Sequence, residues 1–148
     1  NKETEENYKL SDLRSRKDGK STSWYKDGQI KSEAFYIIRT VSSGYEESLH
    51  NGKCTEWYEN GQKKSEINYK EDNFEGKYKT WYENGNKKEE GNYNESSSKD
   101  GKFTLWNEDG SKKSEIHYKD GGRHGKSITW DSDGAKSEEN YKNGRRVT

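Results

Sequence analysis

The sequence predicts an all-β protein, an elongated and twisted antiparallel sheet of five stacked β-hairpin repeats. Two observations carry this prediction. A unit of the form Gly-x4-Trp-x3-Gly-x7-Tyr recurs along the 148 residues, and an Asp-Gly or Asn-Gly dipeptide lies at the centre of each unit. Such dipeptides tolerate positive φ, and between two extended segments they are the strongest short-range signal for a hairpin.

The tryptophans define the repeat, because they follow one another at intervals of 33, 24, 25 and 24 residues. Each has a glycine five residues before it and another four residues after it. A tyrosine closes each unit eight residues after the second glycine, but only seven in the fifth unit, which has lost one residue from its second half. We therefore predict a single repeat domain over residues 1–148. Its units lie at residues 19–36, 52–69, 76–93, 101–118 and 125–141.

Three segments lie outside this pattern. Residues 37–51 form an insertion that contains a β-prone run, and in repeat arrays such insertions map to loops on one face. Residues 8–17 resemble the degenerate end of an earlier unit, and the tail after Tyr141 resembles the start of a sixth. An array cut from a longer one would give this pattern.

The turn type decides which face of the sheet is buried, because a slip of one residue reverses every side chain. A two-residue turn would pair Trp57 with Lys64, whereas a three-residue turn with a glycine bulge would pair Trp57 with Lys63. We favour the three-residue turn because it groups the apolar residues better. It is expected to place on one face Thr55, Trp57, Ser65, Ile67 and Tyr69.

Composition argues against several classes of protein. The 28 basic and 28 acidic residues balance, whereas nucleic-acid-binding proteins normally show a basic stripe. No apolar run approaches the roughly 18 residues of a transmembrane helix. Cys54 is the only cysteine, so no intrachain disulfide is expected.

Candidate catalytic and metal-binding groups do not form a recognisable constellation. His50, His117 and His124 lie far apart, with no cysteine or carboxylate at ligand spacing. Lys-Lys-Ser-Glu strings recur at 63–66 and 112–115, whereas a catalytic carboxylate pair is usually unique, so we expect cross-strand salt bridges. We predict a protein that is not an enzyme and that has no metal site and no cofactor.

The string Gly-Lys-x3-Trp-Tyr-Glu-Asn-Gly-x-Lys-Lys-x-Glu, at residues 52–66 and 76–90, resembles the MORN-repeat variant of bacterial proteins. The linking segments 118–125 and 141–144 are similar to that family's inter-repeat signature, and the resemblance covers about residues 19–144. It implies an elongated, twisted antiparallel sheet. Many bacterial members carry an antitoxin-type label, and eukaryotic relatives are associated with membranes and protein scaffolds. The long first insertion and the shortened fifth unit depart from the family pattern.

The compartment is left open by the sequence. The polar opening, residues 1–7, suits a mature protein whose signal peptide is gone, and it equally suits an engineered truncation. Together with the resemblance to bacterial proteins, it favours an exported or cell-surface location.

An apolar stripe on the second face, confined to the middle three units, is the candidate contact patch. The other reading is that sheet curvature or the 37–51 insertion covers it. The predicted function is a non-enzymatic interaction or scaffold module whose partner is a protein or a second copy of the chain. The alternative is binding of carbohydrate or cell envelope, in which sugars stack on exposed aromatic rings. The patch residues are Tyr58, Tyr78, Tyr82, Phe103 and Leu105, next to Cys54.

Overall fold

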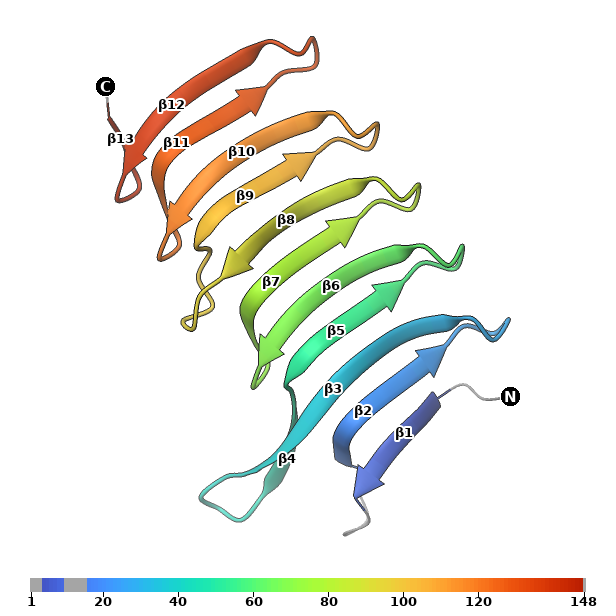
Figure 1. Ribbon diagram of the computed structural model, residues 1–148. Helices are drawn as coiled ribbons and strands as arrows, with labels where there is room; N and C mark the ends of the chain where they lie inside the picture. The colour runs from blue at the N-terminus through green and yellow to red at the C-terminus, as the bar shows by residue number, and fades with distance from the viewer. Residues whose placement is uncertain (1–3, 10–15, 148) are drawn as a thin grey trace.

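The computed structural model describes residues 4–9 and 16–147, and these residues form one antiparallel sheet of thirteen strands (Figure 1). Consecutive strands are neighbours, except that β4 pairs beside β3 and the path runs on from β3 to β5. None of the described residues is helical, so the predicted all-β array of hairpins is confirmed. The strands are β1 (Thr4–Lys9), β2 (Arg16–Trp24), β3 (Ile30–Thr40), β4 (Glu46–His50), β5 (Gly52–Trp57), β6 (Lys63–Lys70), β7 (Asn73–Trp81), β8 (Lys87–Tyr93), β9 (Gly101–Trp106), β10 (Lys112–Lys119), β11 (Gly122–Trp130), β12 (Lys136–Lys142) and β13 (Arg145–Val147).

Five hairpins correspond to the five sequence units, and we call them the first to fifth repeats: β2–β3, β5–β6, β7–β8, β9–β10 and β11–β12. Outside them, β1 pairs with β2 and β13 pairs with β12. The partial unit predicted at 8–17 lies partly outside the described residues, because these omit residues 10–15.

The turn inside each repeat is the predicted three-residue turn with a glycine bulge. In the second repeat the amide of Tyr58 donates to the carbonyl of Gln62 at 2.8 Å, and the amide of Gly61 donates back to the carbonyl of Tyr58 at 2.9 Å. Gly61 has a φ of 81°, in the left-handed region that favours glycine. Trp57 pairs with Lys63, as the three-residue turn requires.

A second bulge directly after this turn corrects the predicted assignment of faces. Beyond Trp57 the register shifts by one residue, so that Cys54 pairs with Ile67 and Lys64 is left as the extra residue. The expectation that Thr55 and Trp57 share a face with Ser65, Ile67 and Tyr69 is therefore wrong. That expectation counted one bulge where the strand has two. Ser65, Ile67 and Tyr69, on the second strand of the hairpin, lie instead on the same face as Cys54.

The same bulge explains why the fifth unit is one residue shorter. Between β11 and β12 the pairing runs without a shift from Trp130–Lys136 to Gly125–Tyr141. The missing residue is the bulge residue, which is a lysine in each of the other repeats. These bulge residues are Lys31, Lys64, Lys88 and Lys113.

The first glycine of each unit pairs with the closing tyrosine and has a positive φ. Gly76 pairs with Tyr93 and has a φ of 91°, which a residue with a side chain rarely adopts. It also lies in the part of β7 where the register with β6 shifts between Ile67 and Tyr69. Bulges bend strands, and the strands bow along their length (Figure 1).

The connections between repeats are a second set of turns. Glu71 and Asp72 have φ values of 49° and 63°, as a two-residue turn with two left-handed residues requires. The insertion 37–51 is a longer version of this connection, since β3 runs on to Thr40 and pairs with β4. The expected loop on one face is therefore instead a hairpin that projects beyond the sheet (Figure 1). Arg39 ties it to the next turn by an ion pair of 2.8 Å with Glu71.

Most of the aromatic core lies on one face, which we call the ring face, whereas the buried Leu49 lies on the other face. On the ring face the aromatic rings form a continuous ladder with centroid separations of 4.4 to 5.9 Å, in tilted and edge-on arrangements that ring quadrupoles favour. Phe103, at 0% exposure, is fully buried in this ladder although the sheet has a single layer. The ladder consists of Tyr36, His50, Tyr69, Phe74, Tyr78, Tyr93, Phe103 and Tyr118.

Gly91 is the residue over which the Phe103 ring packs, because an added Cβ there would lie 2.4 Å from ring atoms. We predict that Gly91→Ala destabilises the chain by about 1–3 kcal/mol through overpacking. In a Phe103→Ala background, itself costing about 3–5 kcal/mol, Gly91→Ala should be neutral or slightly stabilising, because alanine suits a strand better than glycine. Chemical denaturation of the parent chain, the two single variants and the double variant measures these free energies of unfolding. If the losses of the two single variants add in the double variant, the ring does not pack over Gly91.

Candidate functional site

The face opposite the ring face carries the five tryptophans, and we call it the tryptophan face. A lysine of one repeat lies over the indole of the next, as Lys87 Nζ does 5.3 Å from the ring centroid of Trp106. The same lysine binds Glu90 at 2.8 Å, because the bulge at Lys88 brings residues three apart onto one face. The repeated lysine and glutamate strings thus form salt bridges within one strand and cover indoles. The predicted cross-strand salt bridges occur as well, as between Lys53 and Glu66 at 3.2 Å.

The equivalent carboxylates show the electrostatic effect of this arrangement. The hydrogen bond from Lys63 holds the pKa of Glu66 below its usual value, against the opposing effect of burial. Lys112 does the same for the pKa of Glu115. These carboxylates are therefore ionised partners of lysines, and they are not poised as general acids.

Cations extend the aromatic ladder on the ring face. Lys99 Nζ lies 4.3 Å from the ring centroid of Phe103 and binds Glu89 at 2.9 Å. Arg123 lies 5.2 Å from the ring centroid of Tyr141 and donates to its hydroxyl at 3.1 Å. The positions that insert between tyrosines come two residues before the first glycine of each unit, a signal that the sequence analysis missed. They are Lys17, His50, Phe74, Lys99 and Arg123.

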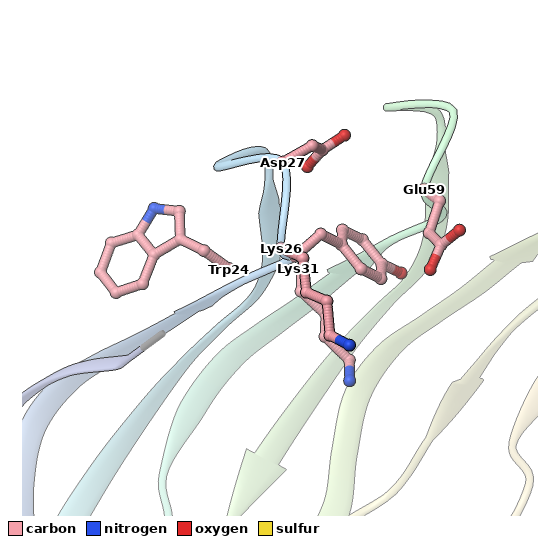
Figure 2. A pocket seen from close by; sticks show the side chains of 6 residues that line it. Trp24, Lys26, Asp27, Lys31 and Glu59 are labelled. Atoms are coloured by element: carbon pink, nitrogen blue, oxygen red, sulfur yellow. The ribbon is translucent and has the colours of Figure 1, made fainter. Parts of the chain in front are cut away.

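The tips of the first and second repeats enclose a hollow of about 640 Å³. Tyr25 crosses it, and its hydroxyl donates to the carbonyl of Trp57 at 2.6 Å. Burial raises the pKa of Tyr25, and Glu59 adds to the effect. Figure 2 shows Trp24 directed away from Glu59 on the other side of the hollow. The lining is Trp24, Tyr25, Lys26, Asp27, Lys31 and Glu59.

The predicted patch residues divide between two roles. Tyr78 and Phe103 belong to the packed ladder, with ring centroids 5.6 and 5.5 Å from that of Tyr93. Tyr58 and Tyr82 act as Tyr25 does, since each hydroxyl donates at 2.9 Å to a tryptophan carbonyl of the next repeat. Leu105 is partly buried on the ring face, where it pairs with Ser114 and Glu89. Much of the middle stripe is thus packed structure.

A second hollow, of about 300 Å³, lies on the ring face between the first and second repeats, and we call it the ring-face hollow. It brings together His50 and Cys54, which the sequence analysis treated as unrelated. Its apolar lining is Ala34, Cys54 and Ile67, its rings are Tyr36, His50 and Tyr69, and its carboxylate is that of Glu56.

The groups in the ring-face hollow do not form an activated nucleophile. Burial raises the pKa of the Cys54 thiol, so the nucleophilic thiolate is disfavoured. His50 is held in place by Asp72. The Asp72 carboxylate lies 2.7 Å from the ring Nδ1 of His50, and it accepts a hydrogen bond of 2.7 Å from the backbone amide of His50. Burial alone would raise the pKa of Asp72, but these hydrogen bonds lower it.

Among the residues that the structure describes, no cluster of three or more His, Cys, Asp and Glu side chains is placed to hold a metal ion. Within the same residues there is no helix of the length and apolarity needed to cross a bilayer.

Comparison with known proteins identifies the repeat. A family model described as MORN repeat variant matches residues 17–37, 51–71, 74–95 and 99–120, which is more than half of the chain. Repeats of this family are in general non-catalytic modules that bind proteins or membranes. A search of curated proteins found no match. The fifth repeat lies outside the matched segments but has the same turn geometry.

Burial of the ladder tyrosines predicts a loss of stability in alkali. Burial raises the pKa of Tyr69, Tyr78 and Tyr93 above the ordinary value of 10.0. The folded chain therefore favours the neutral phenols, a contribution that is complete below about pH 10 and is lost as the pH rises through the folded pKa values. Melting temperatures should fall above about pH 10, together with the rise in tyrosinate absorbance. The melting temperature of the Tyr93→Phe variant should fall less steeply with pH than that of the parent chain. An identical fall would contradict buried tyrosines as the cause.

Proposed function

Because this chain belongs to the family of MORN repeat variants, we propose that it is a non-enzymatic protein-binding module that contacts its partner through the first repeat. The observation that carries the proposal is an exposed apolar surface on that repeat and its insertion. Ile30, Phe35 and Tyr45 are 39%, 42% and 51% exposed. Grouped exposed apolar side chains mark interaction sites in soluble proteins.

The first repeat departs from the other four at two positions of the tryptophan face. Where it has Ile30, the later repeats have a lysine; where it has Phe35, they have asparagine or histidine. A general need of the fold for apolar residues does not explain this, since four repeats form the same hairpin without them. The later residues are Lys63, Lys87, Lys112 and Lys136, and Asn68, Asn92, His117 and Asn140.

The surface continues along the projecting hairpin. Phe35 and Ile37 alternate along β3 and therefore point to one face, and Val41 follows directly after the end of this strand. The loop closes this hairpin where the amide of Val41 donates to the carbonyl of Tyr45 at 2.8 Å. We call the set Ile30, Phe35, Ile37, Val41 and Tyr45 the first-repeat strip. The tip of its hairpin projects past the ends of the neighbouring strands (Figure 1), which favours access by a partner.

The double substitution Ile30→Lys and Phe35→Asn tests this proposal, because it installs the residues of the later repeats. The fold should be retained, and partner affinity should fall by roughly 30-fold, the loss of a hot spot of about 2 kcal/mol. The measurement is affinity capture from the source cells, followed by reconstitution with the purified partner and a melting curve. Lys77→Ala, an exposed change in the third repeat, is the matched control. Full affinity in the double variant would remove the strip from the interface.

More specific roles lie within this proposal. A bacterial source and an antitoxin-type role predict that capture recovers one toxin protein. Binding through the middle stripe predicts that variants of Tyr58 and Tyr82 lose capture. A second copy of the chain as partner predicts self-association in sedimentation. An exported or cell-surface location predicts recovery from the corresponding fraction of the source cells.

Carbohydrate binding is a second candidate, favoured by the junction of the fourth and fifth repeats. There Asn107 takes the place of the bridging tyrosine, and a hollow of about 740 Å³ opens beside Trp130. The ring is partly exposed and has Asp109 and Ser111 near it, a mixture that suits hydroxyl groups above an aromatic face. Tryptophan fluorescence during titration with oligosaccharides, with Trp130→Ala as control, tests this candidate. No change in the parent chain, or an unchanged response in the variant, would exclude Trp130 as a sugar platform.

A further inference from the structure

We propose that the ring-face hollow binds an aromatic side chain of a protein partner, with a basic residue of that partner beside the ring. This inference rests on the proposed protein-binding function and assigns it a second contact. The hollow lies on the opposite face from the first-repeat strip, so each contact can be tested without the other.

The third and fourth repeats show how this face receives a ring. Tyr78 and Phe103 occupy the position that Cys54 occupies in the second repeat and Ser21 in the first. The Phe103 ring fits between Tyr93 and Tyr118, at centroid distances of 5.5 Å from each. The first and second repeats have small residues at this position, and the hollow of about 300 Å³ lies next to it.

The lining suits an aromatic guest. Ala34, Cys54 and Ile67 supply apolar surface, and the ladder rings supply edges and faces. His50 is fixed in place, since its ring centroid lies 4.4 Å from that of Tyr36 and its Nδ1 contacts Asp72. A preformed site does not have to order its own side chains when a guest binds, which favours affinity.

The charge of the hollow indicates which residue of the partner lies beside the bound aromatic ring. The Glu56 carboxylate lies on the face of the hollow, whereas among the described residues no lysine or arginine lines it. Glu56 forms an ion pair with Lys64 at 3.4 Å, and its side chain is 50% exposed. A basic residue of the partner can therefore reach Glu56.

The junction of the third and fourth repeats already contains this combination of groups. Lys99 lies over the Phe103 ring while it binds the carboxylate of Glu89. Ring, cation and carboxylate thus come together on the same face, where cation–π attraction and the ion pair act on one ammonium group. The partner would supply the ring and the cation, and Glu56 would supply the carboxylate.

Three blocked tripeptides titrated into the full chain, followed by heteronuclear NMR, test the proposal. Lys-Phe-Lys should shift the resonances of Ala34, Cys54 and Ile67 in a saturable way. Lys-Ala-Lys should not, and Glu-Phe-Glu should bind several-fold more weakly. Equal effects of the three peptides, no effect, or shifts confined to other residues would overturn the proposal. Shifts of the same resonances with chain concentration alone would assign the hollow to a second copy, which also overturns it.

Substitutions at the hollow give the matched comparison. Cys54→Phe installs the residue that the fourth repeat has at this position, so the chain should fold and bind Lys-Phe-Lys at least tenfold more weakly. Cys54→Ser keeps the space and should bind as the parent does. Glu56→Gln should abolish the preference for Lys-Phe-Lys over Glu-Phe-Glu. It also decides the charge argument if Cys54→Phe fails to fold.

Unchanged binding by a folded Cys54→Phe chain, or an unchanged preference in Glu56→Gln, would overturn the proposal. Such a failure leaves the proposed function intact if Ile30→Lys with Phe35→Asn still loses the partner. If the double variant keeps the partner while the tripeptide results hold, the first-repeat strip fails and the hollow stands.

Discussion

Contact between a closing tyrosine and the rings of its neighbours is the interaction on which this sheet depends. A single-layered sheet has no second layer to bury its apolar side chains, and Leu, Ile, Val and Phe number only 15. The rings therefore bury one another, and the glycine paired with each closing tyrosine has a positive φ that residues with side chains rarely adopt. Phe103 reaches complete burial this way, above Gly91. Salt bridges and indoles on the other face remain partly exposed and contribute less per contact.

Sequence reasoning could find the repeats, the glycine-bulge turn and the class of fold, because glycine, tryptophan and tyrosine recur at fixed intervals. It could not assign the faces, because a bulge adds a residue without changing any interval between repeats. Lys64 is an ordinary surface lysine in the sequence and an extra strand residue in the structure. The sequence indicated the bulge only indirectly, through the fifth unit, which lacks the bulge residue and is therefore one residue shorter. The projecting hairpin was missed because a β-prone run in an insertion does not show which strand it extends.

The candidate binding surfaces arise where individual repeats depart from the common pattern. Ile30 and Phe35 replace polar residues, Cys54 is small where the third and fourth repeats have a ring, and Asn107 replaces a bridging tyrosine. Each departure leaves the hairpin intact, because backbone pairing and the shared glycines hold it. The contact patch expected from sequence began from the same idea, but side-chain packing on the ring face was not visible there. A regular scaffold can therefore carry several different surfaces without a change of fold.

The links between repeats also run in one direction. The hydroxyls of Tyr25, Tyr58 and Tyr82 each reach forward to the following repeat, and the lysine after each of the second to fourth turns covers the indole of the following repeat. The array thus has a direction, because each hairpin provides the tyrosine or lysine that contacts the next hairpin. A duplicated or deleted unit of 24 or 25 residues would rejoin with donor and acceptor in the correct order. Recombination of whole units can therefore change the number of repeats in the array. A unit inserted in the reverse orientation would find no matching donor or acceptor in its neighbours.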